Sequence, residues 1–240
     1  MVDGQHNEMS FLEKIYYERY TKKSYSLSYV DLIIDYLFKN INKGVYIDIG
    51  CNHPIKFNNT YLLYKRGWSG INVDSDIDSI KLFNRFRSKD FNVRNIVSND
   101  ESIKKLYYYH KRSALNTLSK DLVDFRTSKP SKIIEEKSVT LNKIIEDSPY
   151  HNSKINLLSV DIENHEFVAL KNFNFLKYKI DVLAVESTDT SLKKLEMYNQ
   201  SLDFVTKSKV YNLIINNGYK LINWIHSDLV FVRNDFRKTE

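Results

Sequence analysis

The stretch VYIDIGCNHP, residues 45–54, decides the fold of this chain of 240 residues. Its first five residues are apolar except for Asp48, as in a buried strand, and Gly50 opens a turn directly after them. A strand that leads through such a turn into a helix is typical of nucleotide-binding α/β units. Asn52 and Pro54 interrupt the G-x-G-x-x-G run that a pyrophosphate would need. The turn therefore favours a mononucleoside cofactor without a pyrophosphate.

The residues around this stretch alternate between strand and helix patterns. Strands with near-continuous apolar runs are expected over residues 44–50, 69–75, 91–98, 155–162 and 181–187. Helices between them are expected over residues 58–66, 76–87, 140–147 and 166–173. Such alternation predicts an α/β fold, a parallel sheet with helices on both faces.

The C-terminal segment narrows the fold further. A helix over 208–217 is expected to stop at Gly218, and strands over 219–226 and 228–234 are joined by turn residues. Strands this close cannot be linked by a crossover, so one of them must run antiparallel. We therefore predict the class I methyltransferase (Rossmann-like) fold, a seven-stranded, mostly parallel sheet with an antiparallel C-terminal hairpin. A dinucleotide dehydrogenase would continue in parallel.

Two regions lie outside this regular pattern. Residues 1–43 contain helical patterns over 10–23 and 28–40, which we expect to pack on the core, and Ser28 and Asp31 have capping-box spacing. Residues 44–235 form the predicted methyltransferase domain. Within it, the segment at about 104–130 has no clear period and is expected to be an insertion near the site.

Composition limits the partners and the compartment. The net charge of +6 favours anionic partners such as nucleotide-sugars, phosphorylated lipids, membrane surfaces or nucleic acid. Cys51 is the only cysteine, which excludes an intrachain disulfide and predicts a reducing, cytoplasmic compartment. The first ten residues lack a signal-peptide pattern, and no apolar run reaches the roughly 20 residues of a membrane span. Peripheral membrane association stays open.

Acidic residues end four of the predicted strands, at Asp48, Asp74, Asp161 and Glu186. Ligands of open α/β sheets bind outside the carboxyl ends of the strands, so these acids are expected around one site. Asp74 follows the first turn at the distance typical of a carboxylate that binds a ribose 2′,3′-diol. The alternative is that Asp74 or Asp76 simply caps the next helix.

With these motifs in order, the chain resembles the FkbM-like family of S-adenosylmethionine-dependent methyltransferases from about Gly44 to Asn234. The matching pieces are YIDIGCNHP, NNTYLLYKRGWSGINVD, NIVSND, VTLNKII, LLSVDIENHEFVAL, DVLAVE, NGYKLI and LVFVRN. Pro54 and Asn164 stand where the family usually has glycines, and Asn164 can adopt a positive φ. The resemblance implies methyl transfer from S-adenosylmethionine to a hydroxyl, commonly of a sugar.

The expected site has a cofactor part and a catalytic part. The residues expected to contact the cofactor are Asp48, Gly50, Cys51, Asn52, Thr60, Asp74, Ser75, Ser98 and Asp161. Gly50 would let the backbone approach the ligand, and Asn52 tolerates left-handed dihedrals. His165 is the favoured general base, with His53 as the second candidate, because imidazole titrates near neutral pH.

A bound metal is the alternative to a histidine base. Asp161 and Glu186, with Glu163 nearby, could hold Mg²⁺ or Mn²⁺, as in the related macrocin-type O-methyltransferases, whereas Glu166 is expected on the helix surface. The acceptor is expected between residues 104–130 and the two histidines, with Lys111 and Arg112 able to hold an anionic sugar derivative.

Two other classes of protein remain open. A nucleic-acid methyltransferase would suit the basic charge, but the chain lacks an Asn/Asp-Pro-Pro-aromatic motif and a dense basic stripe with interleaved aromatics. We therefore expect no nucleic-acid partner and a small, hydroxyl-bearing acceptor. The second alternative is a cofactor-binding protein without catalytic activity, in which the acids would serve only as caps.

Overall fold

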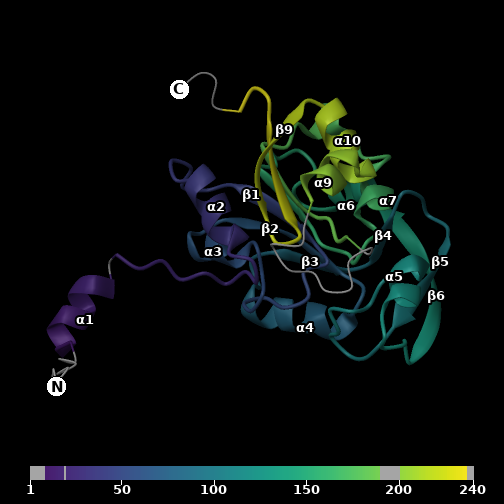
Figure 1. The fold of residues 1–240 in the computed structure, drawn as a ribbon, viewed down its shortest axis with the longest axis horizontal. Helices are drawn as coiled ribbons and strands as arrows, with labels where there is room; N and C mark the ends of the chain where they lie inside the picture. The colour runs from purple at the N-terminus through teal and green to yellow at the C-terminus, as the bar shows by residue number, and fades with distance from the viewer. Residues whose placement is uncertain (1–8, 19, 190–200, 237–240) are drawn as a thin grey trace.

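The computed structural model describes residues 9–18, 20–189 and 201–236, and a seven-stranded sheet forms its centre (Figure 1). In spatial order the strands are β3 (Phe91–Arg94), β2 (Ser69–Asp74), β1 (Val45–Ile49), β7 (Leu157–Val160), β8 (Val182–Glu186), β10 (Asp228–Arg233) and β9 (Tyr219–Ile225). β3, β2, β1, β7 and β8 are parallel, and β10 is antiparallel to both β8 and β9. This arrangement confirms the predicted class I methyltransferase fold.

Helices cover both faces of the sheet because both faces of its strands are apolar. Successive side chains of a strand point to opposite faces, so Ile47 lies in one buried cluster and Tyr46 in the other. The first cluster includes residues of α6 (Leu141–Asp147), α7 (Glu166–Leu170), α8 (Phe175–Tyr178), α9 (Leu202–Lys207) and α10 (Lys209–Asn216). The second cluster includes residues of α2 (Val30–Leu37) and α3 (Tyr61–Lys65).

A second, three-stranded sheet replaces part of the expected insertion. It pairs β4 (Ile96–Ser98), β6 (Lys132–Thr140) and β5 (Ile103–Tyr108), and α5 (Lys120–Phe125) lies between β5 and β6 in the chain. The single strand predicted over 91–98 is therefore wrong: it divides at Asn95, whose N–H donates to the Asp74 carbonyl (3.0 Å). β6 was not predicted, because its sequence KIIEEKSVT has many charges and no continuous apolar run; in the structure most of its residues are exposed or partly exposed.

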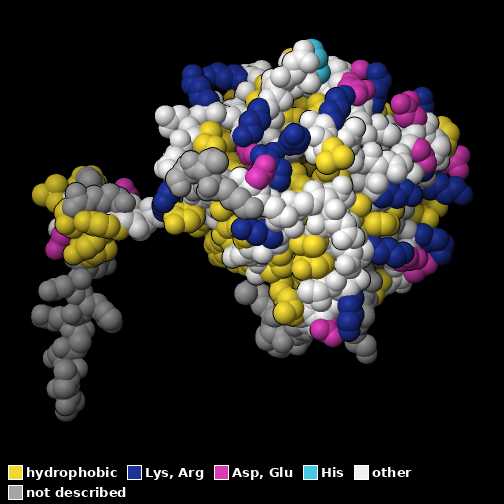
Figure 2. Space-filling model, turned by 90° about the horizontal axis from the view of Figure 1, so that it is seen from above, with side chains coloured by type: hydrophobic (Ala, Val, Ile, Leu, Met, Phe, Trp, Pro, Cys, Tyr) yellow, Lys and Arg dark blue, Asp and Glu magenta, His cyan; other side chains and the backbone are white. Residues whose placement is uncertain are grey.

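The two N-terminal helices behave differently. α2 packs on the sheet through Val30 and Ile34. α1 (Phe11–Glu18) lies apart from the rest of the chain and exposes apolar side chains (Figures 1 and 2), so the expected packing on the core is seen for α2 and not for α1. The capping box at Ser28 and Asp31 is also wrong, because the Asp31 carboxylate accepts from the Tyr25 N–H (2.7 Å) instead.

The C-terminal elements follow the prediction closely. α10 ends at Asn216, and Gly218 has a φ of 85°, as a residue just after a helix often does. The hairpin turn lies at His226 and Ser227, whereas the sequence predicts a turn at Ser227 and Asp228. Across the described ranges we find no helix with the length and apolar character needed to cross a membrane.

Candidate cofactor and acceptor site

A cavity of about 240 Å³ opens at the edge of the sheet where the parallel strands end, as expected for an open α/β sheet. Its walls come from segments far apart in the sequence: Ser26–Ser28, Gly50, Asn52, Phe57, Asn59, Asp74, Ser75, Ile96, Val97, Ser113–Leu118 (without Leu115), Asp161–Glu163, His165, Glu186 and His226–Asp228. The cavity therefore gathers the turn after β1, the ends of β2, β7 and β8, and the C-terminal hairpin.

Gly50 shapes the turn after β1 by approaching another part of the backbone. Its φ is 78°, and a Cβ at this position would lie 1.7 Å from the Asp161 carbonyl oxygen. Gly50 and Cys51 also donate their N–H groups to the Val73 carbonyl at 2.9 and 3.1 Å. The close approach expected at Gly50 is thus first of all to the end of β7, and it presses the turn against the neighbouring strand ends.

Asp48, Cys51 and Thr60 support this turn from behind and do not line the cavity. The Asp48 carboxylate accepts from Asn58 Nδ2 (2.9 Å) and Thr60 Oγ1 (2.8 Å), and burial raises its pKa. Cys51 is 2% exposed and packs in a small apolar cluster. Direct contact of these three side chains with a cofactor, as expected from the sequence, therefore has no support in the geometry.

A fully buried arginine, Arg87, connects the residues behind the turn. The Arg87 guanidinium donates to Asp90 Oδ2 (2.9 Å), Asn58 Oδ1 (3.1 Å) and Thr60 Oγ1 (3.0 Å), and its side chain is 0% exposed. Buried charges of this kind need such partners, because each unpaired one would cost several kcal/mol. No pattern in the sequence pointed to Arg87, which ends the helix α4 (Ile77–Phe86) and has the appearance of a surface residue there.

Asp74 lies at the cavity wall and has acceptor capacity to spare. Its two carboxylate oxygens accept from the N–H groups of Asn52 (2.8 Å) and Asp76 (2.7 Å), and burial raises its pKa to about 6. An ionised carboxylate offers about four acceptor positions, so two remain for the hydroxyls of a ligand. The N-cap of α4 is Asp76, whose side chain accepts from the Asp78 N–H (2.8 Å). The capping role is thus filled without Asp74.

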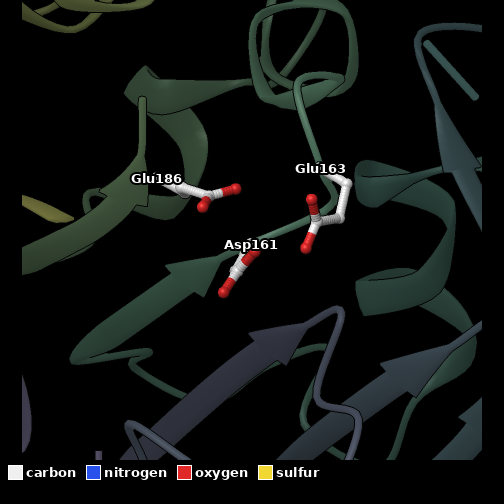
Figure 3. Close-up of side chains that lie close together, drawn as sticks. All are labelled: Asp161, Glu163 and Glu186. Atoms are coloured by element: carbon white, nitrogen blue, oxygen red, sulfur yellow. The ribbon is translucent and has the colours of Figure 1, made fainter. Parts of the chain in front are cut away.

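Three carboxyl groups meet on another wall of the cavity (Figure 3). Asp161 follows β7, Glu186 ends β8, and Glu163 reaches in from the loop after β7; one oxygen of each lies within 4.8 Å of the others. Burial and the neighbouring acids raise the pKa of Asp161 well above its usual range and that of Glu163 to about 8. Burial and the neighbouring acids therefore favour the protonated forms of Asp161 and Glu163, whereas the ion pair with Arg126 opposes this for Glu163.

Two further acids border this group. Glu166 is 4% exposed and accepts from the Ile162 N–H (2.8 Å), so the expectation that it lies on the helix surface is wrong, and burial raises its pKa well above the usual range. Asp228 pairs with Glu186 across β10 and β8, and burial raises its pKa to about 6. Asp228 was not predicted as a site residue. It is the first residue of β10, and a strand antiparallel to β8 begins beside the residue at which β8 ends.

The loop after β7 is held in an unusual conformation by the inserted segment. Glu163 and Asn164 have φ values of 59° and 68°, so Asn164 does take the glycine-like conformation expected of it. Thr117 Oγ1 donates to the Glu163 carbonyl (2.6 Å), and the Arg126 guanidinium forms an ion pair with the Glu163 carboxylate. The insertion thus fixes the position of one of the three clustered carboxyl groups.

The two candidate histidine bases occupy different positions. His165 lines the cavity, and its Nε2 lies 3.0 Å from Ser98 Oγ; Ser98 itself is outside the cavity wall. Burial, together with Lys104 and Lys171, lowers the pKa of His165 to about 4, so its imidazole is neutral at pH 7. His53 does not line the cavity, and its Nδ1 accepts from two backbone N–H groups at 3.1 and 3.0 Å.

The basic residues expected at the acceptor site lie elsewhere. Lys111 Nζ pairs with Asp78 (3.3 Å), and the Arg112 N–H donates to Asp76 (2.6 Å); neither residue lines the cavity. The insertion contributes small and polar residues instead, among them Ala114, Asn116 and Thr117. The expected capture of an anionic sugar by Lys111 and Arg112 therefore has no support in this arrangement.

Comparison with known proteins finds one methyltransferase family. The model of a family described as the methyltransferase FkbM domain matches residues 48–221, which include the turn after β1, Asp74 and the clustered acids. Among solved structures, the chain is similar to a TehB-like SAM-dependent methyltransferase from Corynebacterium glutamicum, with 12% identity, a TM-score of 0.40, and coverage of 92% of this chain and 95% of that one. No curated protein matches the sequence.

Proposed function

Since the chain belongs to the FkbM methyltransferase family, we propose that this S-adenosylmethionine-dependent methyltransferase acts on a hydroxyl of a sugar. The acceptor would be a polysaccharide precursor, a nucleotide-sugar or a related small molecule. The observation that carries this proposal is the group of carboxyl side chains, Asp161, Glu163 and Glu186, on the cavity wall. Carboxyl groups accept hydrogen bonds from sugar hydroxyls, and those with raised pKa values can also take up the proton that a hydroxyl must lose.

The residues around the cavity suit the cofactor that the family uses. Bound S-adenosylmethionine supplies a methyl group on a positively charged sulfur. Asp74 would accept from the two ribose hydroxyls with its free acceptor positions, and the turn at Gly50 and Asn52 would face the rest of the nucleoside. The negative charge shared by Asp161 and its neighbours would offset the positive charge of the cofactor. The absence of a glycine-rich phosphate loop matches a ligand without a pyrophosphate.

Two groups can remove the proton of the acceptor hydroxyl. His165 is neutral and faces the cavity, but a pKa of about 4 makes it a weak base. Glu163, with a pKa near 8, is the stronger base whenever it is ionised, and Arg126 and the insertion hold it in place. A third possibility is Mg²⁺ or Mn²⁺ bound by Asp161 and Glu186, which would lower the pKa of the hydroxyl directly.

The test combines cofactor binding with an acceptor screen. We expect calorimetry to show S-adenosylmethionine binding, and methyl-labelled cofactor to give labelled products from a panel of nucleotide-sugars and simple glycosides. Amino sugars, amines, RNA and DNA serve as contrasting acceptors. Label found only in amines or nucleic acid would overturn the proposal, and a protein that does not bind the cofactor would favour the non-catalytic alternative. Full activity in EDTA would eliminate the metal.

A further inference from the structure

An aromatic side chain stands at the mouth of the cavity in a conformation that phenylalanine rarely adopts. Phe57 has a φ of 53°, lines the cavity and is 54% exposed. A left-handed backbone at a bulky residue is strained by about 1–3 kcal/mol, and such strain is typical of functional sites. Glycine or asparagine would adopt this backbone more easily, and an exposed ring gains little from burial. Stability alone therefore does not account for phenylalanine at this position.

Hydrogen bonds on both sides hold the strained residue in place. The Lys56 N–H donates to His53 Nδ1 (3.0 Å), and the Asn58 N–H donates to the Tyr25 carbonyl (3.0 Å). The Asn58 side chain is anchored in turn on the buried Asp48 carboxylate (2.9 Å). These bonds fix the backbone on both sides of Phe57.

A second exposed apolar residue lies at the same mouth. Leu27 lines the cavity and is 65% exposed. Its segment runs beside the loop of Phe57, because Ser26 Oγ donates to Asn59 Oδ1 (2.8 Å). Two exposed apolar residues, Phe57 and Leu27, thus line the same cavity as the carboxyl groups of Asp161, Glu163 and Glu186.

We propose that Phe57 is the stacking platform for the pyranose ring of the acceptor, with Leu27 extending the same surface. A pyranose has a face of C–H groups and an edge of hydroxyls, so it needs an apolar surface next to hydrogen-bond acceptors. Lys56 Nζ lies 4.6 Å from the centroid of the Phe57 ring and covers one face of it, so the sugar stacks on the opposite face. This inference rests on the proposed function, because it takes the acceptor to be a sugar.

The inference can be tested by binding, without knowledge of the natural acceptor. The probes are methyl β-D-galactopyranoside and methyl β-D-glucopyranoside, observed by saturation-transfer NMR with the protein saturated with S-adenosylhomocysteine. Phe57→Tyr keeps the ring and should bind within about twofold of the unmodified protein. Phe57→Leu keeps apolar bulk without the flat ring and should bind about 3- to 10-fold more weakly, the range that aromatic stacking is known to contribute.

Control variants separate stacking from general damage. Phe86 is also an exposed phenylalanine with a cation over its ring, Arg85 at 5.3 Å, but it does not line the cavity, so Phe86→Leu should leave glycoside binding unchanged. Phe57→Asn suits the left-handed backbone and should raise the melting temperature while weakening glycoside binding.

The outcomes each decide the inference. It is overturned if neither glycoside binds the unmodified protein, if Phe57→Leu binds as well as Phe57→Tyr, or if Phe57→Leu weakens S-adenosylhomocysteine to the same extent. Failure of the proposed function looks different: the acceptor screen with methyl-labelled cofactor would then give no methylated hydroxyl, whatever the glycoside probes show.

Discussion

The Asp74→Asn substitution tests whether this carboxylate binds the ribose of the cofactor. In the unmodified protein both carboxylate oxygens accept backbone N–H groups, from Asn52 and Asp76, and acceptor positions remain for the ligand. The asparagine side chain keeps the shape but has one acceptor oxygen and no charge. Hydrogen bonds to charged groups contribute about 1.5–3 kcal/mol, so the Kd for S-adenosylmethionine should rise about 10- to 140-fold.

Asp76→Asn provides a matched control two residues away. The Asp76 carboxylate also accepts two backbone N–H groups, from Asp78 (2.8 Å) and Arg112 (2.6 Å), but it does not line the cavity at the strand ends. Both variants therefore lose one negative charge and face similar backbone donors. Because asparagine is a good N-cap, we expect Asp76→Asn to bind the cofactor within about twofold of the unmodified protein.

Calorimetry as a function of pH gives a second readout for the same substitution. Burial raises the pKa of Asp74 to about 6, so as the pH falls below 6 the carboxylate is protonated, loses its charge and turns one acceptor position into a donor. Cofactor affinity should therefore rise between pH 5 and 7, less steeply in Asp74→Asn and with unchanged steepness in Asp76→Asn. Equal weakening in both variants, or a Kd for Asp74→Asn within twofold of the unmodified protein, would refute the assignment.

Three further outcomes are expected. Gly50→Ala should prevent stable folding, since its Cβ would meet backbone at 1.7 Å, whereas Gly67→Ala, with a φ of 88° and open space, should cost only about 1–2 kcal/mol in urea unfolding. If His165 is the base, His165→Ala should lower kcat by about 10²- to 10⁴-fold, and activity should show no imidazole step between pH 6 and 7.5, because its pKa is about 4. Without metal or cofactor, the free energy of unfolding should fall as the pH rises from 5 to 8, because native Glu163 and its neighbours bind protons that the unfolded chain has released. Glu163→Gln should flatten this pH dependence. A free energy of unfolding that rises over the same pH range would contradict the prediction.

Much of the fold could be predicted because its signals are local. Apolar runs of strand length alternate with helical spacing, and the short C-terminal connection forces an antiparallel pair. The small second sheet could not be predicted in the same way. β6 is half exposed and rich in charges, and it forms a strand because β4 and β5 pair with it on either side, which is a tertiary effect.

The sequence predicted where the candidate site lies in the fold. It predicted less well which side chains line that site. Strand ends place residues at one edge of a sheet, but they do not say which way each side chain points. Asp48 alternates with Ile47 and Ile49, so its side chain faces the side of the sheet where Asn58 and Thr60 donate to it and where the charge of Arg87 acts on it, and it does not line the cavity. The contributions of Leu27 and Phe57 depend on loops that meet only in the folded chain, and no spacing in the sequence brings them together.

The four acids at the strand ends differ in what surrounds them, and this difference separates their roles. Burial raises the pKa of Asp48 and the positive charge of Arg87 opposes that rise, while Asn58 and Thr60 tie the carboxylate to the support of the turn. Asp74 has backbone N–H donors on both oxygens. For Asp161, burial and the acids Glu186, Glu163 and Asp228 all raise the pKa, while Arg126 pairs with Glu163. A buried group with more acids than cations is stabilised when a ligand brings a further positive charge. The sulfonium cofactor, or a divalent metal, would bring a positive charge to this position. Its binding would then relieve the repulsion between these acids, and this relief would contribute to the binding free energy.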